Sequence, residues 1–368
     1  MKDLLLTPEL KPISSQIAST NQLIGIQYLR GIAALLVVLD HITGMAKLPK
    51  YLSMDILSGW FIAGAVGVEL FFVISGFIIC YVSLDKSSLS PKITASLFFF
   101  RRFVRIIPFM WICIIAYAII KFVIKGRFPG VETLNALFLF PIGKLHPSVI
   151  WTLRHEFLFY GIFCLFTIHY KHHWKWLIAW MLSPLIWFSL GIHDLFEPSD
   201  LRELGNFLFH KVNLLFALGL LIALLSMKGY LNFKLQTRYS FAFSLLSVVP
   251  LFLIARYIGV GEQFEYTQIV ISGIVSAMVV VIGISLQAVK PLGFFDRLGI
   301  ILGDASYAIY LTHTGIASIM FILWTKLGLP LSPLLVLSIG SLLCVIGGVI
   351  IHIFVEKSVI KFVQSLLK

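Results

Sequence analysis

The stretch YLRGIAALLVVLDHITG, residues 28–44, carries a guanidinium, a carboxylate and an imidazole within an otherwise apolar run. Runs of about 20 predominantly apolar residues are typical of helices that cross a lipid bilayer. A charged side chain at the bilayer centre costs about 2.5–3.5 kcal/mol on insertion scales. We therefore expect Arg30, Asp40 and His41 to face the interior of the protein and to have a function there.

The composition of the whole chain indicates a multi-pass membrane protein. Of the 368 residues, 59% are hydrophobic and 12% are charged, and the mean hydropathy is +0.97. Soluble domains carry about 25% charged residues. A net charge of +12 would suit a nucleic-acid-binding protein. However, the lysines and arginines lie in short segments between apolar runs, where they set membrane topology. We expect no nucleic-acid partner.

The apolar runs predict an all-α fold, a polytopic bundle of about ten transmembrane helices. The predicted spans are 24–45, 60–83, 106–124, 149–168, 174–191, 206–226, 238–257, 267–287, 301–325 and 332–354. An earlier start of the third span, through residues 97–105, is also compatible with the sequence. Segment 133–142 is predicted to be re-entrant or interfacial. We expect a cytoplasmic tail over 1–23, one transmembrane domain over 24–354 and a second cytoplasmic tail over 355–368.

The distribution of lysine and arginine predicts the orientation of the helices. With the N-terminus inside, 17 of the 29 Lys and Arg residues fall in inside segments and 10 in outside loops. Because positively charged residues are enriched on the cytoplasmic side, we expect both termini to be cytoplasmic.

The sequence indicates neither a metal site nor a standard nucleophile. The four cysteines lie in apolar runs without metal-ligand spacing, and the histidines form no HExxH motif. Ser75 lies in ISGF and not in the G-x-S-x-G turn of serine hydrolases. We assign Ser75 to helix packing and expect no metal cofactor.

Two ionisable residues of the first span share a helix face. Arg30 and His41 are eleven residues apart. At about 100° and 1.5 Å per residue, this spacing returns to nearly the same face roughly 16 Å further along the axis. A cation near the inner end and an imidazole towards the outer end are therefore predicted to face the same way. The alternative is that both side chains reach the lipid headgroups.

The predicted fourth span begins with WTLRHEFLFY, which is unusually polar for a membrane helix. Thr152, Glu156 and Tyr160 share one face at a spacing of four residues. Arg154 and His155 directly precede the glutamate. Because three adjacent ionisable residues are costly in a bilayer, this segment indicates a functional site. The alternative is an interfacial position.

Polar residues also occur in the predicted second and ninth spans. Glu69 lies in GVELFFVISGF, and a carboxylate at that depth needs a partner. In SYAIYLTHTG, Ser306, Tyr310 and His313 lie along one face. The structural alternatives are an interhelical hydrogen bond for the glutamate and an aromatic belt for the second segment.

Imidazoles and carboxylates of four spans fall at similar depth in this topology, which suits proton transfer. A neutral imidazole accepts a hydroxyl proton, and a carboxylate orients the ring. The predicted catalytic residues are His41, Glu156 and Glu69, and the predicted substrate-binding residues are Arg154, His155, Tyr310 and His313.

A cluster of arginines marks the inner end of the third span. FFFRRFVRIIP contains Arg101, Arg102 and Arg105, and the last two face the same way. Guanidinium groups bind phosphate through forked hydrogen bonds. The alternative is anchoring on anionic membrane lipid. We expect Arg102 and Arg105, together with Arg30, to bind an anionic cofactor from the cytoplasm.

Five segments together resemble the bacterial acyltransferase-3 family, membrane O-acyltransferases that decorate surface carbohydrates. The segments are LRGIAALLVVLDH, GVELFFVISGFII, RRFVRIIP, WTLRHEFLFY and SYAIYLTH, in that order over roughly residues 24–320. Within the family, IQYLRGIAALLVV followed by GVELFFVISGFII is most similar to exopolysaccharide acetyltransferases of the ExoZ type.

The resemblance implies ten core helices in a bacterial inner (plasma) membrane, a cytoplasmic acyl-CoA donor and an acceptor outside the cytoplasm. By position, the family's Arg-x10-His pair corresponds to Arg30 and His41, its Arg-x-x-Arg pair to Arg102 and Arg105, and its acidic residue of the fourth helix to Glu156. The family's closing Glu-Lys-Pro corresponds to VEKS, with serine in place of proline.

We therefore predict a membrane O-acetyltransferase that moves acetyl from cytoplasmic acetyl-CoA to a hydroxyl of a surface carbohydrate or lipid-linked saccharide. A proton-coupled transporter or flippase of a lipid-linked saccharide would also need buried ionisable residues. We find no inverted repeat of the kind that transporters contain. A structural or sensory subunit would use the same residues for helix packing. Direct transfer and a transient acetyl-histidine both remain open.

Overall fold

The computed structural model describes residues 23–126, 128–169, 173–196, 199–261, 266–328 and 332–366. The predicted N-terminal tail lies outside these residues, except for its last position. The helices are α2 (Ile24–Ala46), α3 (Val66–Ser83), α4 (Ala95–Lys125), α5 (Gly130–Leu137), α6 (Trp151–Phe163), α7 (Trp174–Ser189), α8 (Asp200–Leu208), α9 (Val212–Met227), α10 (Ser240–Tyr257), α11 (Tyr266–Ser285), α12 (Phe294–Leu327), α13 (Pro333–Ile351) and α14 (Lys357–Leu366). Short 3₁₀ segments are Leu57–Ala65, Ser148–Ile150 and Ile192–Leu195, and π-helical segments are Cys164–His169 and His352–Glu356.

The helices confirm a multi-pass membrane protein. Within the described ranges, nine helical stretches are long and apolar enough to cross a bilayer. The predicted fifth span corresponds to α7, which has 16 residues. At 1.5 Å per residue, a helix of this length extends about 24 Å, which is less than the hydrocarbon core of about 30 Å. The residue that follows the predicted tenth span, Val355, lies inside a π-helical segment that continues directly into α14.

Two short strands accompany the helices, and the sequence analysis did not predict them. They are β1 (Leu235–Thr237) and β2 (Leu286–Ala288), which pair in parallel with Gln236 opposite Gln287. The pair ties the connection between α9 and α10 to the connection between α11 and α12. Three-residue strands in loops leave no alternating pattern in the sequence, so hydropathy alone does not predict them.

Helix α4 begins eleven residues before the predicted third span. Thr94 is the N-cap of this helix, because its side chain accepts a hydrogen bond from the backbone N–H of Leu97 at 3.3 Å. All three arginines of the RRFVR segment therefore lie on one continuous helix, in its second and third turns.

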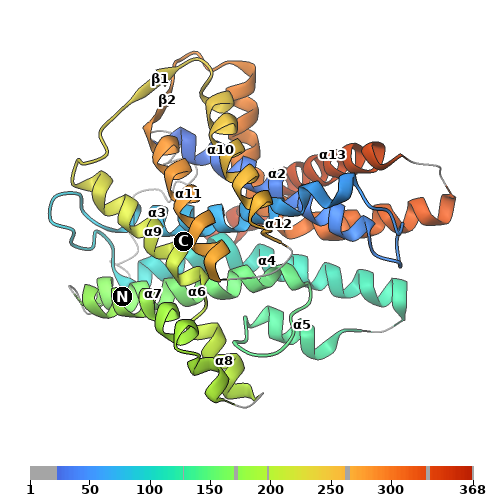
Figure 1. Ribbon diagram of the computed structural model, residues 1–368, viewed down its shortest axis with the longest axis horizontal. Helices are drawn as coiled ribbons and strands as arrows, with labels where there is room; N and C mark the ends of the chain where they lie inside the picture. Colours follow the sequence, from blue (N-terminus) through green and yellow to red (C-terminus); the bar gives the residue numbers. More distant parts are fainter. Residues whose placement is uncertain are drawn as a thin grey trace.

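The segment that was predicted to be re-entrant or interfacial includes the end of α5, which lies against α4 (Figure 1). Trp111 of α4 donates its indole N–H to the carbonyl oxygen of Leu137 at 2.9 Å. Lys121 of α4 pairs with Glu132 of α5 at 3.2 Å. The hydrogen bond from this lysine lowers the pKa of the Glu132 carboxyl.

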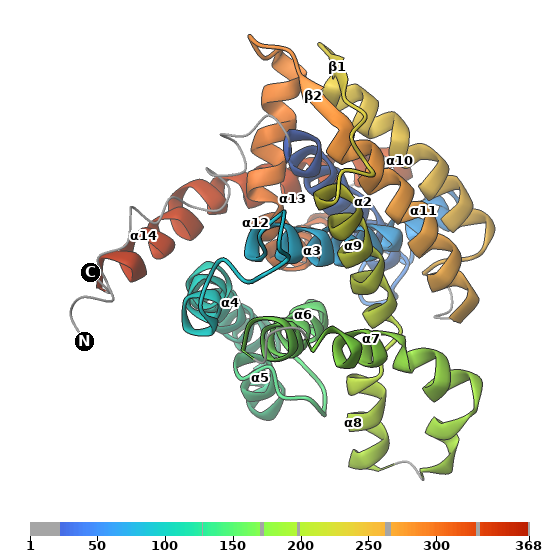
Figure 2. The same cartoon turned by 90° about the vertical axis from the view of Figure 1, so that its left-hand side faces the viewer.

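Most of the helices fall into two groups, which Figure 2 shows one above the other. Helices α4 to α8 form the lower group, and α2, α3 and α10 to α13 form the upper group. Helix α2 is central to the upper group, since it contacts α3, α10, α11, α12 and α13. The boundary between the two groups brings α3 and α12 close to α4 and α6.

Helices α3 and α9 cross closely through glycines, as small residues allow in membrane proteins. A Cβ atom on Gly76 would collide with the main-chain oxygen of Phe216. A Cβ atom on Gly219 would collide with the main-chain oxygen of Val73. Glycine is therefore required on both sides of the crossing.

We predict that Gly219→Ala lowers the free energy of unfolding by about 1–3 kcal/mol, the usual cost of overpacking a close contact. Gly44→Ala is the matched control, because a Cβ atom there meets nothing within 4 Å. Thermal unfolding of the purified proteins in detergent measures the difference. Equal melting temperatures for the two variants would contradict the close crossing.

Candidate functional site

A cavity of about 140 Å³ lies at the boundary between the two helix groups. Side chains of α2, α3, α4, α6 and α12 line it. Its polar lining residues are Arg30, Ser75, Arg102, Arg105, Thr152, Glu156, Tyr160, Ser306, Tyr307 and Tyr310. The cavity thus brings together the three predicted cofactor-binding arginines, one predicted catalytic glutamate and one predicted substrate-binding tyrosine.

Arg102 is held in the cavity wall by aromatic rings. Its guanidinium carbon lies 5.7 Å from the ring centroid of Phe98 and 5.5 Å from that of Tyr160, within the range of cation–π attraction. In the described part of the chain, no carboxylate forms an ion pair with Arg102. Because the rings face the guanidinium without accepting its N–H bonds, these donors remain available to an anionic ligand.

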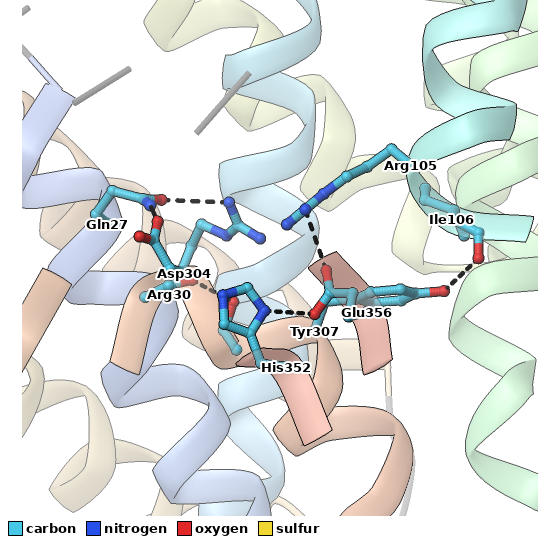
Figure 3. A network of polar contacts seen from close by, with 10 residues as sticks. Gln27, Arg30, Arg105, Ile106, Asp304, Tyr307, His352 and Glu356 are labelled. Atoms are coloured by element: carbon cyan, nitrogen blue, oxygen red, sulfur yellow. Dashed lines mark hydrogen bonds and ion pairs between the residues drawn. The ribbon is translucent and has the colours of Figure 1, made fainter. Parts of the chain in front are cut away.

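Arg30 enters the cavity from α2 and is linked to α12 through a glutamine. Its Nη1 donates to Gln27 Oε1 at 3.2 Å, and Gln27 Nε2 donates to Asp304 Oδ1 at 2.5 Å (Figure 3). This chain of hydrogen bonds connects the cation to a carboxylate without direct contact. Neither Gln27 nor Asp304 was predicted from the sequence to be a site residue.

Arg105 is paired with an acid from the opposite end of the sequence. Its Nη1 lies 3.1 Å from Glu356 Oε1, and His352 Nδ1 lies 2.7 Å from Glu356 Oε2 (Figure 3). Glu356 lies in the segment that was predicted to be a cytoplasmic tail, and its contact with Arg105 was not predicted. The available signal was the glutamate of VEKS, which follows an apolar span directly.

Glu156 accepts two hydroxyl hydrogen bonds in the middle of the cavity. Ser75 Oγ donates to Glu156 Oε1 at 2.9 Å, and Tyr160 Oη donates to the same oxygen. Ser75 is therefore a cavity residue, whereas the sequence analysis assigned it to helix packing. The close helix contact is made by the next residue, Gly76. The predicted shared face of Thr152, Glu156 and Tyr160 is confirmed, since all three line the cavity.

The far end of the cavity leads through aromatic rings towards the histidines. Tyr310 Oη donates to the carbonyl oxygen of Val149 at 3.1 Å and lies 2.9 Å from Thr152 Oγ1. The ring of Tyr310 lies 5.9 Å from that of His313, centroid to centroid. Neither His41 of α2 nor His313 of α12 lines the cavity. Tyr310 and His313 therefore lie between the cavity and His41.

His41 and His313 face each other, with ring centroids 4.8 Å apart. Their Nδ1 atoms lie 2.9 Å and 3.1 Å from the carbonyl oxygens of Val37 and Ile309. Because a carbonyl oxygen only accepts, each Nδ1 carries the proton, and each Nε2 is the basic atom of the neutral ring. His313 is buried, whereas 32% of the His41 side chain is exposed, and Asp40 Oδ2 lies 3.6 Å from its Nδ1.

Tyr117 of α4 supports α12 beside these histidines, a role that no sequence motif suggested. Its hydroxyl accepts from the backbone N–H of Gly315 at 2.6 Å and lies 3.1 Å from the carbonyl oxygen of Leu311. The Tyr117 hydroxyl thus contacts both the N–H and the C=O group of one i→i−4 backbone pair of α12. The two residues of this pair, Leu311 and Gly315, lie two positions before and after His313. The ring also fills the space that a Cβ atom on Gly315 would need.

Glu69 does not reach the cavity. Its side chain is buried on α3 against Ser272 of α11, and its Oε2 has no hydrogen-bond partner among the described residues. Glu69 precedes Ser75 by six residues, which places the two side chains about 120° apart around the helix. Glu69 therefore points away from Ser75 and from the cavity that contains Glu156.

Arg154 and His155 also lie outside the cavity lining. Arg154 Nη1 donates to the carbonyl oxygen of Phe140 at 3.1 Å and so holds the connection between α5 and α6. The His155 ring lies 4.5 Å from that of His210, and its Nδ1 lies 2.8 Å from the carbonyl oxygen of Trp151. Of the predicted substrate-binding residues, only Tyr310 lines the cavity.

The described residues contain no group of three or more His, Cys, Asp or Glu side chains that could hold a metal ion. The donor set of the cavity is instead guanidinium, carboxylate and hydroxyl. Such groups bind a charged organic ligand and transfer protons.

A membrane bundle with this set of cations, hydroxyls and nearby imidazoles agrees with the sequence comparison. The profile of an acyltransferase domain family matches residues 23–353, and the chain belongs to this family. It is a multi-pass membrane protein of the enzyme class that transfers acyl groups. A similar protein is the exopolysaccharide production protein ExoZ of Rhizobium meliloti (strain 1021). The two are 28% identical over an alignment of 274 residues, which covers 71% of this chain and 78% of ExoZ. No solved structure matches the chain.

We predict that Ser75→Cys reacts with a small thiol reagent, methanethiosulfonate ethylammonium, about tenfold faster or more than a cysteine buried in the bundle, because thiol reactivity requires access. Ser276→Cys is the matched control, since Ser276 is fully buried on α11. The native cysteines are buried and contribute little background. Mass spectrometry of the intact protein measures both rates. Equal, slow modification of the two variants would show that the cavity is closed to solutes.

Proposed function

We propose that the protein is an O-acetyltransferase that moves an acetyl group from cytoplasmic acetyl-CoA to a hydroxyl of an exported carbohydrate. One observation carries the proposal. A single cavity gathers three guanidinium groups and Glu156, and Tyr310 at its far end leads through His313 to His41. Binding of an anionic carrier of an activated acyl group needs the guanidinium groups. Deprotonation of an acceptor hydroxyl needs the imidazole.

The donor would bind at the end of the cavity near the start of α4. Phosphates of CoA would contact Arg102, Arg105 and Arg30, since guanidinium N–H groups match phosphate oxygens in pairs. The pantetheine arm would run along the cavity past Glu156. The thioester would lie towards the end that Thr152 and Tyr310 form. The side chains of Tyr310 and His313 stand between this end and His41, so they would have to move aside for the transfer. The orientation with both termini in the cytoplasm, in the inner membrane, is part of this proposal.

The transfer would use the imidazole of His41 as a general base. Its Nε2 takes the proton of the acceptor hydroxyl while the hydroxyl oxygen attacks the thioester carbonyl carbon. The carbon–sulfur bond breaks, and the CoA sulfur leaves with the proton from the imidazolium. The same nitrogen can instead carry the acetyl group briefly before the hydroxyl accepts it. Both routes need the tautomer that the Val37 carbonyl fixes.

Charge balance for the imidazolium would come from Asp40 and not from Glu156 or Glu69. Asp40 Oδ2 lies 3.6 Å from His41 Nδ1. The hydrogen bonds of Glu156 go to Ser75 and Tyr160, so we assign it to the donor cavity, where it opposes the guanidinium charge. Glu69 remains a candidate whose effect would pass through the packing of α3 on α11. Arg154 and His155 remain candidates for contacts with the acceptor outside the cavity.

The acceptor would reach His41 from outside the bundle. The His41 side chain is 32% exposed, whereas His313 is buried. The name of the relative ExoZ refers to exopolysaccharide production, and on this basis we propose an exopolysaccharide or its lipid-linked precursor as the acceptor class. Membrane lipid would surround the apolar outer faces of the helices.

A transporter or flippase of a lipid-linked saccharide is the second candidate, because exposed and buried histidines side by side also suit proton coupling. Isotopically labelled acetyl-CoA distinguishes the two. A transferase places the label on cell-surface glycan, and a transporter does not. A purely structural subunit would tolerate isosteric changes such as His41→Asn without loss of glycan acetylation.

We predict that His41→Ala lowers acetyl transfer by at least about 100-fold, the lower range for loss of a general base. Binding of CoA to the purified variant is expected to stay within about twofold of wild type, because His41 lies beyond the cavity. Mass spectrometry of surface glycans measures transfer, and calorimetry measures binding. A variant that retains wild-type transfer would contradict the role of His41.

We predict that Arg102→Ala weakens CoA binding by about 10- to 100-fold, since a hydrogen bond to a charged group contributes about 1.5–3 kcal/mol. Arg101→Ala is the matched control. Arg101 is the adjacent arginine on α4, but it does not line the cavity. Calorimetric titration of the purified variants with CoA measures both affinities. Equal losses for both arginines would indicate a general surface charge in place of a site.

A further inference from the structure

Glu356 is fully buried at the boundary between α4 and the C-terminal helices. One carboxylate oxygen lies 3.1 Å from Arg105 Nη1, and the other lies 2.7 Å from His352 Nδ1 (Figure 3). A carboxylate accepts hydrogen bonds only, so the histidine Nδ1 carries a proton and donates it. The three side chains form a line from His352 through Glu356 to Arg105.

An irregular segment of backbone places this carboxylate. The π-helical segment His352–Glu356 interrupts the helix between α13 and α14. Such segments occur mostly as single wide turns and are frequent at functional sites. The segment packs against α12, and α14 packs against α4. The turn therefore brings Glu356 to the part of α4 that contains Arg105.

The buried ion pair between Arg105 and Glu356 is energetically unfavourable as a means of holding two helices together. Each buried ion costs several kcal/mol of desolvation, and well-packed apolar residues in its place are often equally stable or more stable. Arg105 also keeps contact with the cavity, since it lines the cavity and 22% of its side chain is exposed. A guanidinium has five N–H donors, so pairing on one side leaves other donors for a ligand.

Comparison with Arg102 shows how the pairing with Glu356 distinguishes Arg105. It lines the same cavity one helical turn earlier, and aromatic rings hold it in place of a carboxylate. Of the two α4 arginines that line the cavity, Arg102 thus keeps its N–H donors available to a ligand, whereas the direction of Arg105 is fixed by an acid. Glu356 itself cannot bind a phosphate, because two anions repel each other. A favourable effect of Glu356 on an anionic donor must therefore pass through a cation near it, and Arg105 is the cavity arginine with which it forms an ion pair.

We propose that Glu356, held by His352, is a positioning residue that directs the Arg105 guanidinium into the cavity for the phosphates of the acyl donor. This inference rests on the proposed function and adds to it a residue pair from the last helices. His352 fixes the carboxylate, the carboxylate fixes the guanidinium, and the guanidinium contacts the ligand. Loss of Glu356 leaves Arg105 charged but without a fixed direction.

A double-mutant cycle on the full-length protein in detergent tests the proposal. The variants are Glu356→Ala, Arg105→Ala and the double variant, and the readout is the dissociation constant of CoA from calorimetric titration. We expect Glu356→Ala to weaken CoA binding about tenfold in the wild-type background. In the Arg105→Ala background, the same change is expected to have less than a twofold effect, because residues that act through one another are not additive.

Glu356→Gln keeps the proposal testable if removal of the carboxylate prevents folding. The amide keeps one acceptor oxygen, but its NH₂ group cannot accept from a second donor. We expect CoA binding to weaken about threefold, and this loss is again expected to vanish in the Arg105→Ala background. Size-exclusion profiles and melting curves of each variant report folding independently of ligand.

The outcomes separate this inference from the proposed function. If wild-type protein does not bind CoA, the donor assignment fails, and the inference fails with it. If wild type binds CoA and Arg102→Ala weakens binding, but Glu356 variants bind as wild type, only the positioning role is overturned. An equal loss from Glu356→Ala in both backgrounds also overturns it, because the glutamate then acts independently of Arg105.

Discussion

The arrangement of the bundle depends on the need to satisfy buried charges from within the chain, because lipid offers no hydrogen bonds. Arg30 meets this need through Gln27 and Asp304, and Arg105 meets it through Glu356. The Gln27–Asp304 hydrogen bond joins α2 to α12, and the Arg105–Glu356 ion pair joins α4 to the last helices, so both connect segments that are distant in sequence. These polar contacts therefore act together with the close packing of apolar and glycine faces to bring distant helices around the cavity.

The hydropathy of the sequence predicted most of the membrane-crossing helices, because any helix in contact with lipid must be apolar over its length. Helix ends were less predictable. Thr94 caps α4 well before its most apolar part begins, and α7 ends after 16 residues. Local caps and turns set such boundaries, and an average over about 20 residues does not detect them.

Helical periodicity predicted which residues of one helix lie together, and Thr152, Glu156 and Tyr160 do line one cavity. It did not predict which helix each face would meet. The contact of Ser75 with Glu156 joins α3 to α6. Glu69 instead turns towards α11 and lies apart from the other acids. Periodicity gives the direction of a side chain around its own axis, whereas the neighbour depends on how all helices pack.

The pairing of Arg105 with Glu356 has a consequence for biosynthesis. The two residues are separated by about 250 positions in the chain. At about 5–20 residues per second, the ribosome makes the glutamate about 10–50 s after the arginine. During that interval the nascent α4 carries a guanidinium whose acid has not yet been translated. Insertion of this helix must therefore tolerate a temporary lone cation, held near the headgroups or by the insertion machinery, until the last helices arrive.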